Sequence, residues 1–321
     1  MAAAGGTAVL IRDIVDEGTW VLGRIEQTVG ASSTPRPAHV ALVLLLRHVL
    51  SLADAVDELF RAGCFQPAML PMRAILEARM QLLYVLGERN PYSPSPIEPG
   101  DVDAVPRDPA GGALAGAALE ATQDQRGRAY WVAELRQSRD TAAGLDPAVI
   151  APRLESLLGT RTVPAYLADP AVQAEAAAEL GRWNALLAEA DNASISAEFQ
   201  RVRGKKKHDP PWYALWGGPQ SVWKLARSVG MAFQYDWFYS RASRTMHGTD
   251  VMGQLGPERS AGGRAVAPLR GATGLEDVAT AFVIQMYFVY RASILAVRPD
   301  EEPLTRAWLE RWWRDPTRTV Q

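Results

Sequence analysis

The stretch that decides the fold is AHVALVLLLRHVLSLADAVDELFR, residues 38–61. Its first half is almost entirely apolar, and its second half carries Asp54, Asp57, Glu58 and Arg61. Apolar residues recur through it at helical spacing, with charged residues gathered towards the end. The pattern predicts one long helix, which is largely buried in its first half and more exposed to solvent in its second half.

A second long helix is predicted immediately after the first. Gly63 and Pro67 indicate a tight turn, and residues 68–87 (AMLPMRAILEARMQLLYVLG) again carry apolar side chains at helical spacing. Pro71 would then lie in the first turn, where proline is tolerated. Two long helices joined by a short turn form an antiparallel hairpin.

The rest of the chain also favours helices. Alternating β-branched residues are almost absent, so no sheet is predicted, and the fold class is all-α. Further helices are expected at residues 11–29, 112–144, 147–158, 170–190, 222–230, 233–247, 275–297 and 308–313. We expect four parts: the first helices of a bundle (1–90), a Pro-rich loop (91–112), an inserted Ala-rich helical subdomain (113–196) and the remaining helices of the bundle (197–321).

Composition narrows the function classes. The chain has 321 residues, 48% of them hydrophobic, which is ample for a sizeable core. Its formal charge of −2 argues against a protein that coats nucleic acid through overall basicity, so any anion site must be a local patch. One cysteine, Cys64, allows no disulfide within the chain and no multi-cysteine metal site. With four histidines, zinc catalysis is not expected, and we predict no metal and no cofactor.

No targeting or membrane segment is predicted. Arg12 and Asp13 interrupt the first apolar stretch, so no signal peptide forms. The apolar runs at 41–46 and 281–297 fall short of the roughly 20 apolar residues that a spanning helix needs. Both are interpreted as buried core helices, and a cytoplasmic protein is expected.

A polar stripe is the main chemical lead. Tyr235, Tyr239, Ser243 and His247 follow one another at intervals of four residues, and residues four apart share one face of a helix. The stripe could be a set of buried side chains that hydrogen-bond one another or the backbone. It could equally line a polar cleft in which His247 is the titratable member.

Arg73 and Glu77 form a second polar element, within the apolar second helix of the hairpin. They are an i,i+4 pair, and their neighbours suggest partial burial. A buried pair needs further hydrogen-bond partners, and Arg241 or His247 could supply them.

A basic run occupies residues 201–208. Its candidate phosphate- or RNA-binding side chains are Arg203, Lys205, Lys206 and Lys207. Aromatic residues at 212, 213 and 216 follow it and could stack on bases. The alternatives are a solvated loop for the run and apolar anchors of that loop for the aromatic residues.

Segments 71–77 and 207–247 together resemble an uncharacterised bacterial family of HEPN-like helical proteins, over about residues 38–90 and 200–300. The resemblance implies an antiparallel, usually dimeric helical bundle, often a metal-independent ribonuclease of toxin or antiphage type. It also implies the family's Arg-x4–6-His motif, which Arg241 and His247 match. His247 would then be general acid or base towards a ribose 2′-hydroxyl or leaving oxygen, and Arg241 would stabilise the phosphorane. On a regular helix Arg241 points about 120° away from His247.

Three functions therefore remain open. The first is a metal-independent endoribonuclease or RNA-binding protein of defence or stress type, acting as a homodimer. The second is a non-catalytic module that binds a nucleotide or a protein. The third is a small-molecule enzyme with its pocket beside the polar stripe.

Overall fold

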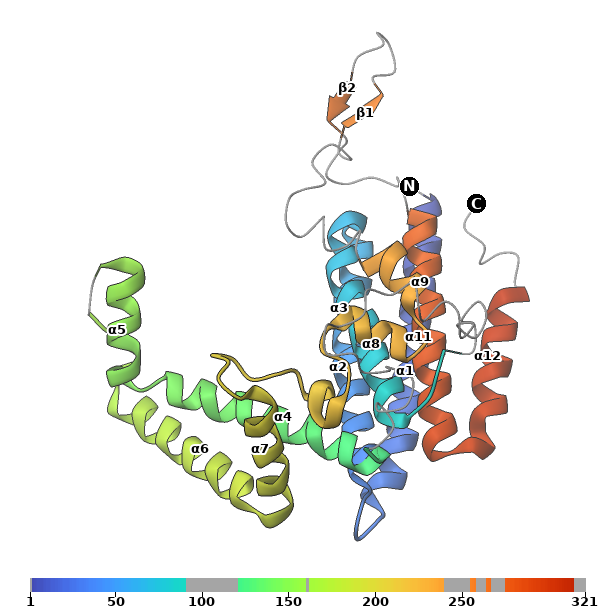
Figure 1. Cartoon of the computed structure of the whole chain (residues 1–321). Helices are drawn as coiled ribbons and strands as arrows, with labels where there is room; N and C mark the ends of the chain where they lie inside the picture. Colours follow the sequence, from blue (N-terminus) through green and yellow to red (C-terminus); the bar gives the residue numbers. More distant parts are fainter. Residues whose placement is uncertain are drawn as a thin grey trace, which may run out of the picture. The chain divides into compact units, whose positions relative to one another are not determined.

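The computed structural model describes residues 2–90, 121–159, 162–239, 255–257, 264–266 and 275–314. Helices dominate these residues, and the fold is all-α (Figure 1). The chain divides into two compact units: unit 1 comprises Met1–Leu114 with Ser221–Gln321, and unit 2 comprises Ala115–Gln220. An inserted helical block was predicted, and each unit is described separately below.

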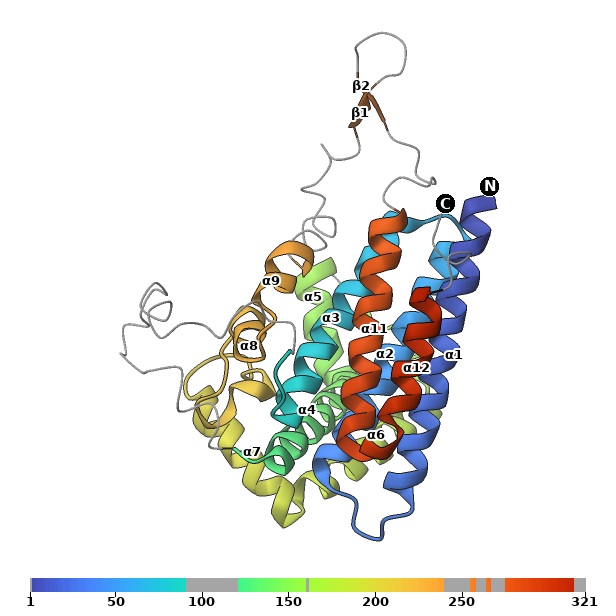
Figure 2. The same cartoon turned by 90° about the vertical axis from the view of Figure 1, so that its right-hand side faces the viewer.

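Unit 1 is built around a bundle of long helices. In Figures 1 and 2, α1, α2, α3 and α11 lie side by side, and each contacts at least two of the others. The elements of unit 1 are α1 (Ala2–Gly30), α2 (Pro37–Arg61), α3 (Phe65–Leu86), α8 (Val222–Ser228), α9 (Ala232–Gln234), the π-helical turn η3 (Tyr235–Tyr239), α11 (Leu275–Val297), the 3-10 turn η5 (Pro299–Glu301) and α12 (Glu302–Arg314).

The predicted hairpin of α2 and α3 is confirmed, with one correction. Along α2, buried residues from Leu42 to Phe60 recur every three or four positions and form its packing face. Helix α3 begins at Phe65, earlier than predicted, so Pro71 lies inside the helix rather than in its first turn. Proline has no N–H and therefore interrupts the hydrogen-bond ladder at this point. Gly87 ends α3 in a left-handed conformation, with φ +69°.

Helices α1 and α11 approach closely at a glycine. Tyr290 of α11 is fully buried, and its hydroxyl donates to the Ile14 carbonyl at 2.9 Å. A Cβ atom at Gly18 of α1 would lie 2.1 Å from that hydroxyl oxygen and 2.5 Å from Leu50 Cδ2. Only glycine therefore fits at position 18 without moving its neighbours.

Two buried glutamates, Glu301 of η5 and Glu302 at the start of α12, form ion pairs with arginines of α1 and α11. Glu301 accepts from Arg24 of α1, with Nε at 3.0 Å, and these bonds lower the pKa of its carboxyl. Glu302 accepts from Arg291 of α11 at 2.7 Å and from Arg306 at 2.7 Å. Burial alone would raise the pKa of Glu302, but the two arginines outweigh burial and lower it.

Two helices of the described chain are long and apolar enough to cross a membrane by length and composition alone, α2 and the Val278–Val297 part of α11. Both extend beyond the apolar runs noted in the sequence. In this fold α2 packs against α1 and α3, and α11 packs against the same helices. That packing agrees with their interpretation as core helices, and the absence of a membrane role stays a prediction.

Two short strands also occur where no sheet was predicted. β1 (Leu255–Pro257) and β2 (Arg264–Val266) pair antiparallel, with Gly256 opposite Ala265. Three-residue strands are too short to carry a visible alternation of apolar and polar residues.

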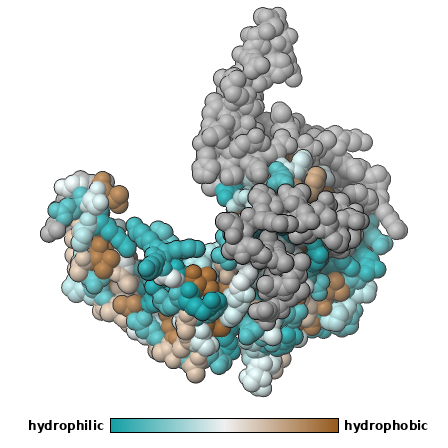
Figure 3. All heavy atoms as spheres, viewed as in Figure 1, coloured by the Kyte–Doolittle hydropathy of each residue, from teal (hydrophilic) through white to brown (hydrophobic). Residues whose placement is uncertain are grey.

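Unit 2 is a second helical assembly. Its elements are α4 (Gln123–Gly144), α5 (Pro147–Leu158), α6 (Pro170–Ala188), α7 (Ala190–Arg203) and the 3-10 turn η2 (Trp212–Gly217). Side-chain caps set the helix starts: Thr122 forms a capping box with Gln125, and Asp146 and Asp169 each accept from the backbone two residues on. On the face of unit 2 seen in Figure 3, apolar groups are interrupted by hydrophilic ones.

The boundary predicted at residue 196 is wrong, because it falls inside α7. Phe199, beyond that boundary, is 2% exposed and belongs to the core of unit 2. Trp212 packs edge-on against Tyr130 of α4, with ring centroids 5.6 Å apart. The basic run and the aromatic residues after it therefore belong to unit 2, which extends to Gln220.

Candidate functional site

Helix α3 presents Arg73 and Glu77 on one face of unit 1. Both side chains are half-buried, as the apolar neighbours predicted. Met72 and Leu76, directly before each of them, are buried and fix the rotation of the helix. The two polar side chains are therefore held at the edge of the core.

Tyr239 lies between Arg73 and Glu77 and connects them. Arg73 Nη2 donates to the Tyr239 hydroxyl at 2.7 Å, and that hydroxyl donates to Glu77 Oε2 at 3.3 Å. The guanidinium carbon also lies 4.4 Å from the centroid of the Tyr239 ring, within cation–π range. The pair predicted to need outside partners therefore has Tyr239 as one of them, whereas the partners named in the prediction, Arg241 and His247, lie outside the described residues.

Tyr235 completes what we call the Arg73 cluster (Arg73, Glu77, Tyr235 and Tyr239). Its ring stacks on that of Tyr239, with centroids 4.6 Å apart and planes 18° apart. Burial raises the pKa of both phenols, although Arg73 acts in the opposite direction. Both phenols are therefore protonated at neutral pH, and Tyr239 has the proton that it donates to Glu77.

The helix that carries the tyrosines departs from α geometry. Residues 235–239 form a π-helical turn, in which hydrogen bonds run from i to i+5. The predicted sharing of a face by Tyr235 and Tyr239 is confirmed. The other residues of the stripe and motif, Arg241, Ser243 and His247, lie outside the described residues.

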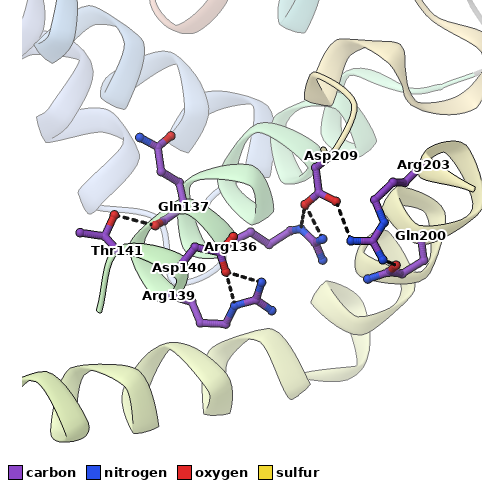
Figure 4. Close-up of polar contacts among 8 residues, drawn as sticks. All are labelled: Arg136, Gln137, Arg139, Asp140, Thr141, Gln200, Arg203 and Asp209. Carbon is purple, nitrogen blue, oxygen red and sulfur yellow. Dashed lines mark hydrogen bonds and ion pairs between the residues drawn. The ribbon is translucent and has the colours of Figure 1, made fainter. Parts of the chain in front are cut away.

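In unit 2, the arginine of the predicted phosphate-binding set is already paired. Figure 4 shows Asp209 between Arg136 and Arg203: Arg136 Nε donates to Oδ2 at 3.0 Å and Arg203 Nη1 to Oδ1 at 3.4 Å. Arg203 also donates to Gln200, and Arg136 lies over the Phe199 ring, 5.0 Å from its centroid. These contacts fold the end of the basic run back onto α4 and α7.

The lysines of the basic run differ from Arg203. Lys205, Lys206 and Lys207 are exposed. Of the aromatic residues, Trp212 is 7% and Tyr213 6% exposed, so both act as anchors rather than as open stacking surfaces. The exposed cationic part of the predicted set is therefore the three lysines.

Within the described residues, no group of three or more His, Cys, Asp or Glu side chains could hold a metal ion. Cys64 is a free thiol and half-buried. The Arg73 cluster offers hydrogen-bond donors, a cation and a carboxylate.

Comparison with known proteins adds no relative: no protein-family model, curated protein or solved structure matches this chain.

Proposed function

We propose that this chain is a metal-independent endoribonuclease, built on a HEPN-like bundle, whose site adjoins the Arg73 cluster. The observation that carries the proposal is the Tyr239 hydroxyl, which joins a half-buried cation to a carboxylate on α3. Ser240–His247, with the Arg241 and His247 motif, follows Tyr239 directly in the sequence. Dimerisation and a defence or stress role are part of the same proposal and rest on the family resemblance.

In the proposed reaction, the ribose 2′-oxygen attacks phosphorus and the bond to the 5′-oxygen breaks. The 2′-hydroxyl proton goes to a general base, and a general acid protonates the departing 5′-oxygen. The products are a 2′,3′-cyclic phosphate and a 5′-hydroxyl, and no oxidant or metal is consumed. His247 would be the general acid or base in these transfers. Arg241 and Arg73 would stabilise the charge on the phosphorane.

A non-catalytic binding role is the second candidate, because the hydrogen bonds of Tyr239 are complete without a ligand. Its hydroxyl accepts from Arg73 and donates to Glu77. A structural role, in which the network holds η3 on α3, would be enough to account for these hydrogen bonds. The exposed Lys205–Lys207 would then contribute a local attraction for phosphate.

The test is RNA cleavage by the purified full chain in EDTA, using 5′-labelled single-stranded and hairpin RNAs. Variants His247→Ala, Arg241→Ala and Arg73→Gln are compared with the wild type. Matched controls are His48→Ala and Arg47→Gln, since both residues are exposed on α2. Loss of a single general acid–base group is expected to reduce the rate about 10²- to 10⁴-fold.

Cleavage that ends in a 2′,3′-cyclic phosphate, falls in the three site variants and persists in both controls would support the ribonuclease. A folded wild type that binds these RNAs without cleaving any of them would replace it with the binding module. A wild type that neither binds nor cleaves them would refute the ribonuclease and any RNA-binding role.

A further inference from the structure

A second arginine of α3, Arg79, is buried in unit 1, and no carboxylate among the described residues pairs with it. It is 2% exposed, and burial lowers its pKa to about 9, so it still carries its charge at neutral pH. Its described acceptors are two side-chain amides, those of Gln285 on α11 and Asn90, and its guanidinium carbon lies 4.7 Å from the Phe288 ring centroid. Because a buried charge is costly unless it is well hydrogen-bonded, such an arginine requires an explanation.

The hydrogen bond to Asn90 determines how the Asn90 amide is oriented. A guanidinium only donates, so Arg79 Nη2 must face the amide oxygen, 3.0 Å away. The amide nitrogen is thereby turned to the Gly230 carbonyl, to which it donates at 3.3 Å. The backbone N–H of Asn90 donates to the Val229 carbonyl at 2.8 Å. Asn90 thus binds two successive carbonyls of the turn that follows α8, and Arg79 orients the amide that binds the second of them.

That turn leads directly to the tyrosines of the Arg73 cluster. Gly230 has φ +71°, and Met231, fully buried, donates its N–H to the Ala226 carbonyl at 2.7 Å. The Met231 carbonyl in turn accepts from the Tyr235 N–H at 3.0 Å. Between Asn90 and Tyr235 there is therefore a continuous path of hydrogen bonds and buried backbone.

We propose that Arg79 and Asn90 are positioning residues, which fix the start of α9 and η3 and so hold the Tyr239 hydroxyl between Arg73 and Glu77. Arg79 lies six residues after Arg73 on the same helix, so α3 carries both the positioning arginine and the arginine of the cluster. Only the catalytic consequence, a slower cleavage, rests on the proposed ribonuclease function. The geometric consequence can be measured without any substrate.

The test uses the full chain labelled with 3-fluorotyrosine and observed by ¹⁹F NMR. The Tyr239 resonance is assigned by its loss in Tyr239→Phe, and Arg73→Gln is expected to shift it, because the guanidinium lies against its ring. The size of that shift reports the contact between Arg73 and Tyr239. It is then measured again in two backgrounds, Asn90→Ala and Arg79→Met/Gln285→Leu, the second of which keeps the core volume.

In both backgrounds the shift caused by Arg73→Gln is expected to fall to roughly half of its wild-type value or less, as for coupled residues in one network. Arg79→Lys should not restore it, since an ammonium lacks the fork that reaches both amides. Two controls separate positioning from general weakening: Gly18→Ala, in the same unit, and the exposed Asn184→Ala should both retain the full shift.

A full shift in the Asn90→Ala background would overturn the proposal, and so would an equal loss in Gly18→Ala. If the wild type cleaves no RNA and the coupling is nevertheless lost as expected, the ribonuclease function fails while the positioning role stands. If RNA is cleaved and the coupling is retained, the ribonuclease function stands and the positioning role fails.

Discussion

Replacing Gly18 by alanine should test how tightly α1, α2 and α11 are packed. The added Cβ would lie 2.1 Å from the Tyr290 hydroxyl oxygen, 2.4 Å from its Cζ and 2.5 Å from Leu50 Cδ2. None of these atoms is the free end of a flexible, exposed chain: Tyr290 is fully buried, and Leu50 is 7% exposed. The tyrosine ring must therefore move.

The magnitude follows from three contributions to the free energy of unfolding. Overpacking costs about 1–3 kcal/mol, and a Tyr290 hydroxyl displaced from the Ile14 carbonyl loses about 1–3 kcal/mol as an unpaired buried group. Removing a glycine from a helix interior returns about 0.5–1 kcal/mol. The net expectation is a destabilisation of about 1–5 kcal/mol.

Gly23 supplies the matched control, because it lies in the same helix and a Cβ there would meet nothing within 4 Å. Gly23→Ala should stabilise by about 0.5–1 kcal/mol. Both variants are unfolded in guanidinium chloride. Hydrogen exchange is followed by mass spectrometry in peptides of α1 and α11, so that the measurement reports the unfolding of unit 1 and not that of unit 2. Gly18→Ala/Tyr290→Phe should recover only part of the loss, since Cζ remains. A Gly18→Ala protein as stable as Gly23→Ala would refute the packing argument.

Three further predictions concern ionic contacts and a helix cap. The pKa values of Glu301 and Glu302 are lowered in the folded state, so the two carboxylates stabilise the fold fully above the ordinary carboxyl pKa of 4.5. This contribution is lost as the pH falls through the lowered values. Glu301→Gln should therefore flatten that part of the curve of unfolding free energy against pH, measured by urea denaturation. Asp209→Ala should destabilise unit 2 by about 1–3 kcal/mol, because it leaves Arg136, whose side chain is 7% exposed, without its carboxylate; an unchanged unfolding midpoint would contradict this. Thr122→Ala should cost about 0.5–2 kcal/mol through the lost capping box and increase hydrogen exchange in the first turn of α4 alone.

The long helices could be predicted from the sequence because their apolar spacing is dense. In α2 the buried residues from Leu42 to Phe60 repeat every three or four positions, so the helix and its inner face follow from one pattern. Helix α7 could not be found this way. Only Asn192, Ile195 and Phe199 are buried along its length, and the basic residues at its end favour interpretation as a loop.

The four residues of the Arg73 cluster could be singled out from the sequence, but the contacts between them could not. The spacing of Tyr235 and Tyr239 indicated a shared face, and the apolar neighbours of Arg73 indicated burial. That Tyr239 bridges Arg73 and Glu77 depends on the packing of residues more than 160 positions apart. Arg79 carried no signal at all, since an arginine within an apolar helix is usually interpreted as reaching solvent.

The insertion of unit 2 has a consequence for the growing chain on the ribosome. Helix α3 ends at Leu86, whereas α8, one of its packing partners, begins at Val222, about 135 residues later. At about 5–20 residues per second, the interval between them lasts about 7–27 seconds. During that time α1, α2 and α3 lack the faces of α8 and α11 that pack against them in unit 1. A nascent chain of this protein should therefore be a client for chaperones that hold exposed hydrophobic surface until α8 and α11 have been synthesised.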